Sequence, residues 1–118
     1  MICLVDIIER DLYVYGRGAK VYRRYLKTIG YDRRKGLSQL ESIQIPPEVK
    51  ETIKSVEPKV KRYKQLIPRA KEDPSIVPFG GDWLGLTAEM YLVEWRGWRD
   101  IAKYEPKFAA KIPWYINM

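Results

Sequence analysis

The chain contains no histidine and only one cysteine among its 118 residues. Histidine is the commonest general base and the commonest metal ligand in proteins, so its absence argues against a metalloenzyme and against Ser-His or Cys-His hydrolases. The single Cys3 excludes an internal disulfide and lies in an apolar run, as a buried structural thiol does. We therefore expect a protein that is not an enzyme and that needs no cofactor or metal.

Long apolar runs are also missing. No stretch approaches the roughly 18 apolar residues that span a bilayer, so we expect no membrane partner. Asp6 and Glu9 interrupt the apolar start and no small-residue cleavage site follows, which argues against a signal peptide. These features favour a single soluble domain, or one component of a soluble assembly, with a modest core.

Positive charge is abundant, and it lies in one part of the chain. Residues 1–66 hold 15 Lys/Arg against 8 Asp/Glu, whereas residues 67–118 hold 7 of each. All four tryptophans lie in the second part. This division predicts a basic module followed by a neutral, aromatic extension, each facing different partners.

The basic part reads as an alternation of strands and helices. Residues 2–8 form a branched apolar run typical of a buried strand, and Gly16-Arg17-Gly18 resembles a turn. Residues 19–29 have a helical period, with an apolar face listed as Tyr22, Tyr25, Leu26 and Ile29. A short strand is expected within residues 37–45.

Residues 46–64 allow two interpretations. In the first, a helix begins at Pro46 and Pro47, ends at Pro58, and turns directly into a basic strand around Val60. In the second, an apolar seam at steps of four and three continues through Pro58 as a coiled coil. The first is favoured because a proline interrupts the seam before three heptads are complete. The economical packing is then a small antiparallel or mixed sheet with both helices on one face.

One face of the expected helix over residues 19–29 is uniformly basic. The stripe continues into the loop at residues 31–36, and between Arg17 and Lys35 there are eight cations and one anion. A stripe of one sign favours binding to a polyanion, because it neutralises several phosphates at once. The candidate RNA-binding residues are Arg17, Lys20, Arg23, Arg24, Lys27, Arg33, Arg34, Lys35 and Lys61.

Two segments carry a resemblance to a known family. The sequences TIGYDRR at residues 28–34 and PEVKETIKSV at residues 47–56, the latter followed by VK at residues 60–61, resemble the L-thirty family of large-subunit ribosomal proteins. The chain departs from the family pattern at Asp11, and at Glu51, where the family favours glycine. The resemblance covers about residues 1–66. It implies a ferredoxin-like βαβαβ core of the α+β class, with a three-stranded antiparallel sheet, two helices on one face, and packing on ribosomal RNA.

Residues 67–118 lie outside that resemblance. They are expected to form an extension with a helix near residues 87–104, whose wide apolar girth needs more than one surface to bury against. Its aromatic side chains are candidate anchors for neighbouring ribosomal proteins, namely Trp83, Trp95, Trp98 and Trp114. Long extensions around such a core resemble mitochondrial ribosomal proteins, which implies a mitochondrial location, with a cytoplasmic one as the alternative.

The sequence thus predicts a structural constituent of the large ribosomal subunit, with no small-molecule substrate. An RNA- or DNA-binding module outside the ribosome, of archaeal or viral type, is the alternative. A third hypothesis is a small nuclease in which Asp6, Glu9 and Asp11 hold a divalent ion. Nothing else in the sequence completes such a site.

Overall fold

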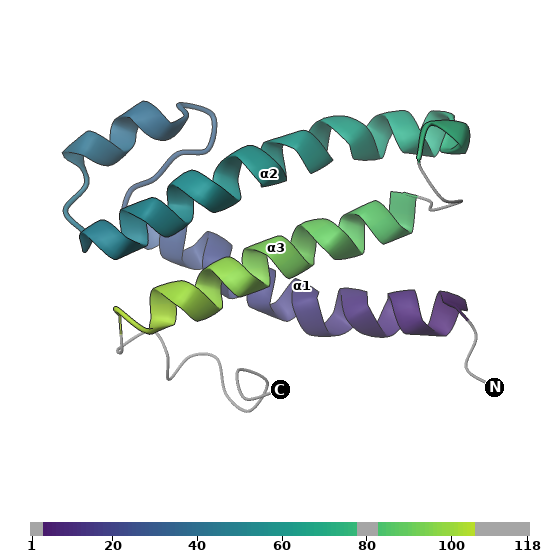
Figure 1. The fold of residues 1–118 in the computed structure, drawn as a ribbon, viewed down its shortest axis with the longest axis horizontal. Helices are drawn as coiled ribbons and strands as arrows, with labels where there is room; N and C mark the ends of the chain where they lie inside the picture. Colours follow the sequence, from purple (N-terminus) through teal and green to yellow (C-terminus); the bar gives the residue numbers. More distant parts are fainter. Residues whose placement is uncertain (1–3, 78–82, 106–118) are drawn as a thin grey trace.

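A computed structural model describes residues 4–77 and 83–105, and in these ranges the chain is helical, with no β-strand. Three long helices, α1 (Leu4–Thr28), α2 (Pro47–Glu72) and α3 (Trp83–Ala102), are accompanied by two 3-10 helices, η1 (Leu37–Ser42) and η2 (Pro74–Ile76). Helix α2 runs antiparallel to the other two, and α3 packs on both α1 and α2 (Figure 1). The expected α+β fold with a three-stranded sheet is therefore wrong.

Each expected strand in the described ranges is replaced wholly or largely by a helix. The apolar run at residues 2–8 enters α1 from Leu4 onward, since a short apolar run fits a buried helix as well as a strand. The segment at residues 37–45 contains η1, and the expected strand at Val60 lies inside α2. The seam at steps of four and three was the stronger signal in residues 46–64, because it runs through the proline without a change of period.

Helix α2 continues through Pro58 and Pro68. Each proline lies on an exposed side of α2, so the carbonyl that loses its hydrogen-bond partner can bind water instead. On the opposite side Val49 and Ile53 are buried at 0% exposure. Burial of this apolar side maintains the helix, although each interior proline costs roughly 3 kcal/mol relative to alanine.

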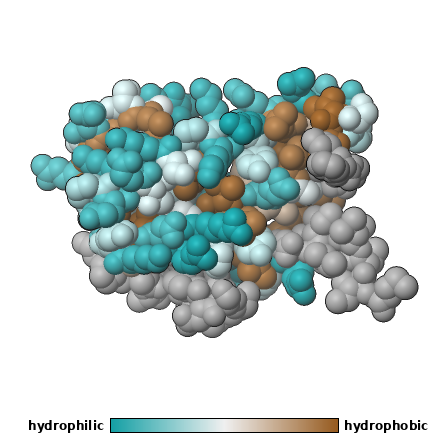
Figure 2. Space-filling view, viewed as in Figure 1, coloured by the Kyte–Doolittle hydropathy of each residue, from teal (hydrophilic) through white to brown (hydrophobic). Residues whose placement is uncertain are grey.

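The core lies where α3 meets the other two helices. Tyr22 and Tyr25 of α1, Ile53 of α2, and Trp98 and Ile101 of α3 are almost fully buried. The outward faces carry the charge. Figure 2 shows hydrophilic residues over most of the face seen in Figure 1, with hydrophobic residues in smaller patches between them. The expected apolar side of residues 19–29 is confirmed, and the helix expected near residues 87–104 is α3, beginning at Trp83.

The Gly-Arg-Gly stretch is not a turn but part of α1, where it allows close contact with α3. A Cβ placed on Gly18 would lie 2.0 Å from Cδ1 of Trp95, so only glycine leaves room for that ring. A Cβ on Gly16 would lie 3.5 Å from Tyr91, an ordinary van der Waals distance. The two glycines therefore differ in what they do.

We predict opposite effects on stability for the two substitutions. Gly18→Ala should lower the free energy of unfolding by about 1–3 kcal/mol, because the methyl group displaces the Trp95 ring. Gly16→Ala should raise it by up to about 1 kcal/mol, because alanine is the better helix former and meets no clash. Urea unfolding followed by circular dichroism measures both changes. Equal effects would contradict the close approach of α1 and α3 at Gly18.

Candidate functional site

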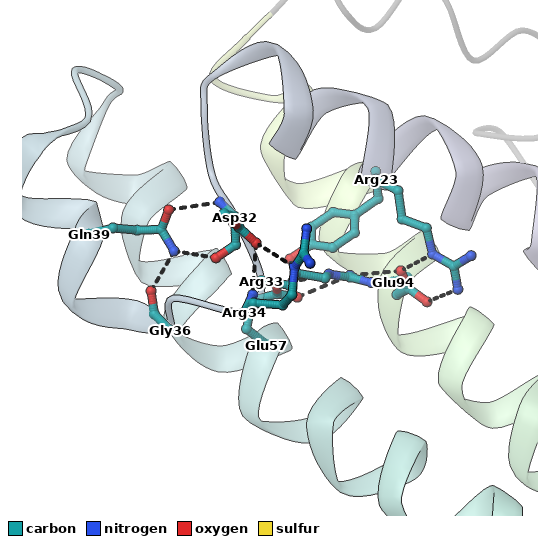
Figure 3. A network of polar contacts seen from close by, with 9 residues as sticks. Arg23, Asp32, Arg33, Arg34, Gly36, Gln39, Glu57 and Glu94 are labelled. Carbon is teal, nitrogen blue, oxygen red and sulfur yellow. Dashed lines mark hydrogen bonds and ion pairs between the residues drawn. The ribbon is translucent and has the colours of Figure 1, made fainter.

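The polar centre of the molecule is built around Arg33, which follows α1 in the loop before η1. Its Nε donates to Oε1 of Glu57 at 3.0 Å, and its Nη2 donates to Oε2 of Glu57 at 3.1 Å and to Oε2 of Glu94 at 2.8 Å. Glu57 belongs to α2 and Glu94 to α3, so one guanidinium joins the loop to both helices (Figure 3).

Helix α1 enters the same network through two neighbouring side chains. Arg23 makes a bidentate pair with Glu94, from Nε to Oε2 and from Nη2 to Oε1, each at 2.9 Å. The hydroxyl of Tyr22 donates to Oε2 of Glu57 at 3.0 Å. All three long helices are therefore tied to a single cluster of two guanidiniums and two carboxylates.

Burial explains why this cluster must be complete. Glu94 is 0% exposed, and an ionised carboxylate in such a position is tolerated only with full pairing. Burial disfavours the charged form of Arg33, but Glu94 and Glu57 outweigh that effect and raise its pKa. Burial, with Glu57 next in importance, raises the pKa of Tyr22 well above its ordinary value, which keeps the hydroxyl protonated as a donor.

The loop that carries Arg33 is held in shape by Gln39 of η1. The Gln39 side chain accepts from the backbone N–H of Asp32 at 2.7 Å and donates to the carbonyls of Asp32 and Gly36 at 2.5 and 2.7 Å (Figure 3). Gly30 and Gly36 bound the loop, each with a φ of 83°, which glycine adopts without strain. The loop therefore presents its remaining side chains in a defined place, and the side chain of Arg34 is 94% exposed.

Two hollows adjoin this loop. The first, of about 660 Å³, lies beside the end of α1 and is called the α1 hollow. The second, of about 680 Å³, lies between the loop and α2 and is called the α2 hollow. The cations that line the α1 hollow are Arg23, Arg24, Lys27, Arg33 and Arg34. Those that line the α2 hollow are Arg33, Arg34, Lys35, Lys61 and Lys64.

Most of the RNA-binding residues expected from the sequence meet at these two hollows. Arg17 and Lys20 do not, because they lie on exposed positions of α1 outside both linings. Arg17 places its guanidinium over the ring of Tyr13. Arg23 and Arg33 line the hollows, but their guanidiniums also hold the helices together through Glu94.

Lys64 is the lining cation that the sequence prediction missed. It follows Lys61 by three residues and shares its side of a helix, but in the expected strand the two would have pointed to opposite faces. Burial lowers the pKa of Lys64, and the charges of Arg33 and Arg23 lower it further. The charges of Glu94 and Glu57 act in the opposite direction but do not outweigh these effects.

Two of the four tryptophans expected at a protein interface are buried in the core. Trp95 is packed beside Tyr15, and Trp98 beside Tyr25, both in the core between α1 and α3. Neither presents its ring to a partner. Trp83 begins α3 and lies 4.5 Å from the ammonium of Lys71, measured to the ring centroid. Trp114 lies outside the described residues.

The nuclease hypothesis also falls outside what the structure describes, since the side chains of Asp6, Glu9 and Asp11 are not among the described ones. Within the described side chains, no group of three or more acidic, cysteine or histidine residues could hold a metal ion. None of the helices in that part of the chain is long and apolar enough to cross a membrane.

Comparison with known proteins adds no relative. No protein-family model, curated protein or solved structure matches the chain. The functional argument therefore depends on the geometry of the cluster and of the two hollows.

We predict that the fold is destabilised if the buried carboxylate of the cluster is replaced by a neutral amide. Glu94→Gln should lower the free energy of unfolding by about 3 kcal/mol, because Arg23 loses a bidentate partner and Arg33 loses one of two. Glu51→Gln is the matched control, because both side chains of the Glu51–Lys54 ion pair are exposed. That pair should contribute at most about 1 kcal/mol to the free energy of unfolding. Urea unfolding at neutral pH compares the two variants. A loss for Glu94→Gln no larger than the control's would contradict the structural role of the cluster.

Proposed function

We propose that this protein binds nucleic acid, and RNA in particular, through the phosphate backbone at the two hollows. The observation that carries the proposal is the imbalance of charge on this surface. Eight different cations line the two hollows, and the only acidic residues among the lining ones are Asp32 and Glu57.

The lining cations divide into two groups with different tasks. Arg23 and Arg33 are engaged by the buried carboxylates, and Arg34 lies 3.6 Å from Asp32. Among the described residues, no ion pair engages the remaining five, which are Arg24, Lys27, Lys35, Lys61 and Lys64. These exposed cations are the ones that can exchange their counterions for phosphates, which is the main source of sequence-independent affinity for nucleic acids.

The link to the ribosome is weaker than the link to RNA. The fold implied by the resemblance to the L-thirty family is wrong for this chain, so that resemblance no longer supports a specific place on ribosomal RNA. The basic surface does not depend on it. Attachment to the large ribosomal subunit and a mitochondrial location stay predictions. Salt-resistant co-sedimentation with large subunits would test the attachment.

The proposal predicts a change in the salt dependence of binding. In the variant Lys27→Gln, Lys35→Gln, Lys61→Gln, the slope of log affinity against log salt should become shallower by about 2–3, because each lost phosphate contact contributes about 0.7–0.9. Fluorescence anisotropy with a labelled RNA oligonucleotide, read at several salt concentrations, measures the slope.

The control removes the same charge from other surfaces. Lys59, Arg69 and Arg96 are exposed and line neither hollow. Their joint replacement by glutamine should leave the slope nearly unchanged. If the two triple variants have the same slope, the affinity comes from net charge alone and this surface is not the binding site.

A further inference from the structure

The α2 hollow has an apolar wall that a phosphate-binding surface does not require. Leu37 and Pro58 line it with accessible apolar surface, above the buried Val60 and Tyr31, and Lys61 and Lys64 line the same hollow. At about 680 Å³ the hollow is within the range of small-molecule pockets, roughly 300–1,000 Å³. An apolar wall beside several cations suits a ligand that has a flat apolar part and a phosphate.

Pro58 is the unusual member of that wall. In the interior of α2 it removes a backbone hydrogen bond and is unfavourable for the helix, yet it lies on the exposed side where packing does not require it. Its ring lines the α2 hollow. A rigid, exposed apolar ring at this position is a surface on which the face of a base can rest.

The loop after α1 separates the two hollows. Tyr31, Arg33 and Arg34 line both of them, so a ligand that occupies both must cross this loop. The side chain of Arg34 is exposed at the crossing. A polymer with repeated phosphates can cross in this way, whereas a free nucleotide occupies one side only.

We infer that single-stranded nucleic acid crosses this loop and places one unstacked base in the α2 hollow, against Pro58 and Leu37. Phosphates next to that base lie on Lys61 and Lys64, and phosphates beyond the loop lie on Lys27 of the α1 hollow. A duplex cannot bind in this way, because its bases are stacked inside and only its backbone is accessible. This inference rests on the proposed function and specifies the form of nucleic acid that the surface selects.

The test compares Pro58→Ala with Pro68→Ala. Both variants remove an exposed proline ring from α2, but Pro68 does not line the hollow. Affinities are measured by anisotropy for a single-stranded RNA, the same RNA annealed to its complement, an abasic sugar–phosphate strand of equal length, and adenosine monophosphate as a competitor. Urea unfolding of both variants is the stability control. Each should be at least as stable as the parent chain, because alanine restores a helical hydrogen bond.

Pro58→Ala removes two ring methylenes. It should weaken binding of the single-stranded RNA about fourfold if the base covers the equivalent of roughly one of them. The same variant should leave binding of the abasic strand and the slope of log affinity against log salt unchanged, and Pro68→Ala should change neither. The duplex should bind more weakly than the single strand, and the mononucleotide should compete poorly.

Four results would overturn the inference. The first is equal affinities of the two proline variants for the single strand. The second is a loss of affinity of Pro58→Ala for the abasic strand that equals its loss for the single-stranded RNA. The third is a duplex that binds as tightly as the single strand, and the fourth is a mononucleotide that competes as well as the strand. In these cases a salt slope that still depends on the lining lysines leaves the proposed function intact. Absence of RNA binding by the parent chain would overturn both.

Discussion

The structure depends on the burial of one carboxylate. Glu94 is fully buried within the helical bundle. A buried charge left without a partner would be strongly destabilising. Arg23 from α1 and Arg33 from the loop satisfy it, and Arg33 also holds Glu57 of α2. The helices must therefore meet in one register for the charges to balance. The same requirement fixes the loop between the two hollows, so the internal ion pairs determine where the external cations lie.

Close packing supplies the second constraint, and it again involves α3. A Cβ on Gly97 would lie 2.7 Å from Cγ2 of Val56, so this glycine lets α3 approach α2 closely. On α1, Gly18 makes room for the ring of Trp95. Glycines in mid-helix reduce helix propensity, and their use here is explained by the side chains packed against them, Val56 at Gly97 and Trp95 at Gly18.

Local patterns in the sequence were better guides than the topology. The helix over residues 19–29, the apolar seam of residues 46–64 and the helix near residues 87–104 are all visible as periods of three and four, and the structure has helices at each. The expected strands are wrong because a short apolar run has no period that separates strand from helix. In addition, a proline on the exposed side of a helix, as Pro58 is, need not end that helix. The basic loop was predictable from composition. The pairing of Arg23 and Arg33 with buried glutamates was not predictable, because the partners are distant in the sequence. Glu94 is 71 residues from Arg23 and 61 from Arg33, and Glu57 is 24 residues from Arg33.

The sequence division at residue 66 suggested a core with a separable extension, whereas α3 provides the buried carboxylate and the side chains that cover both other helices. We infer that α1 and α2 have no stable arrangement without α3. Circular dichroism during urea unfolding of a chain ending at Val77 tests this most directly. We predict a low helical signal that fades gradually, without a cooperative transition. A cooperative transition with the helical content of α1 and α2 retained would contradict it.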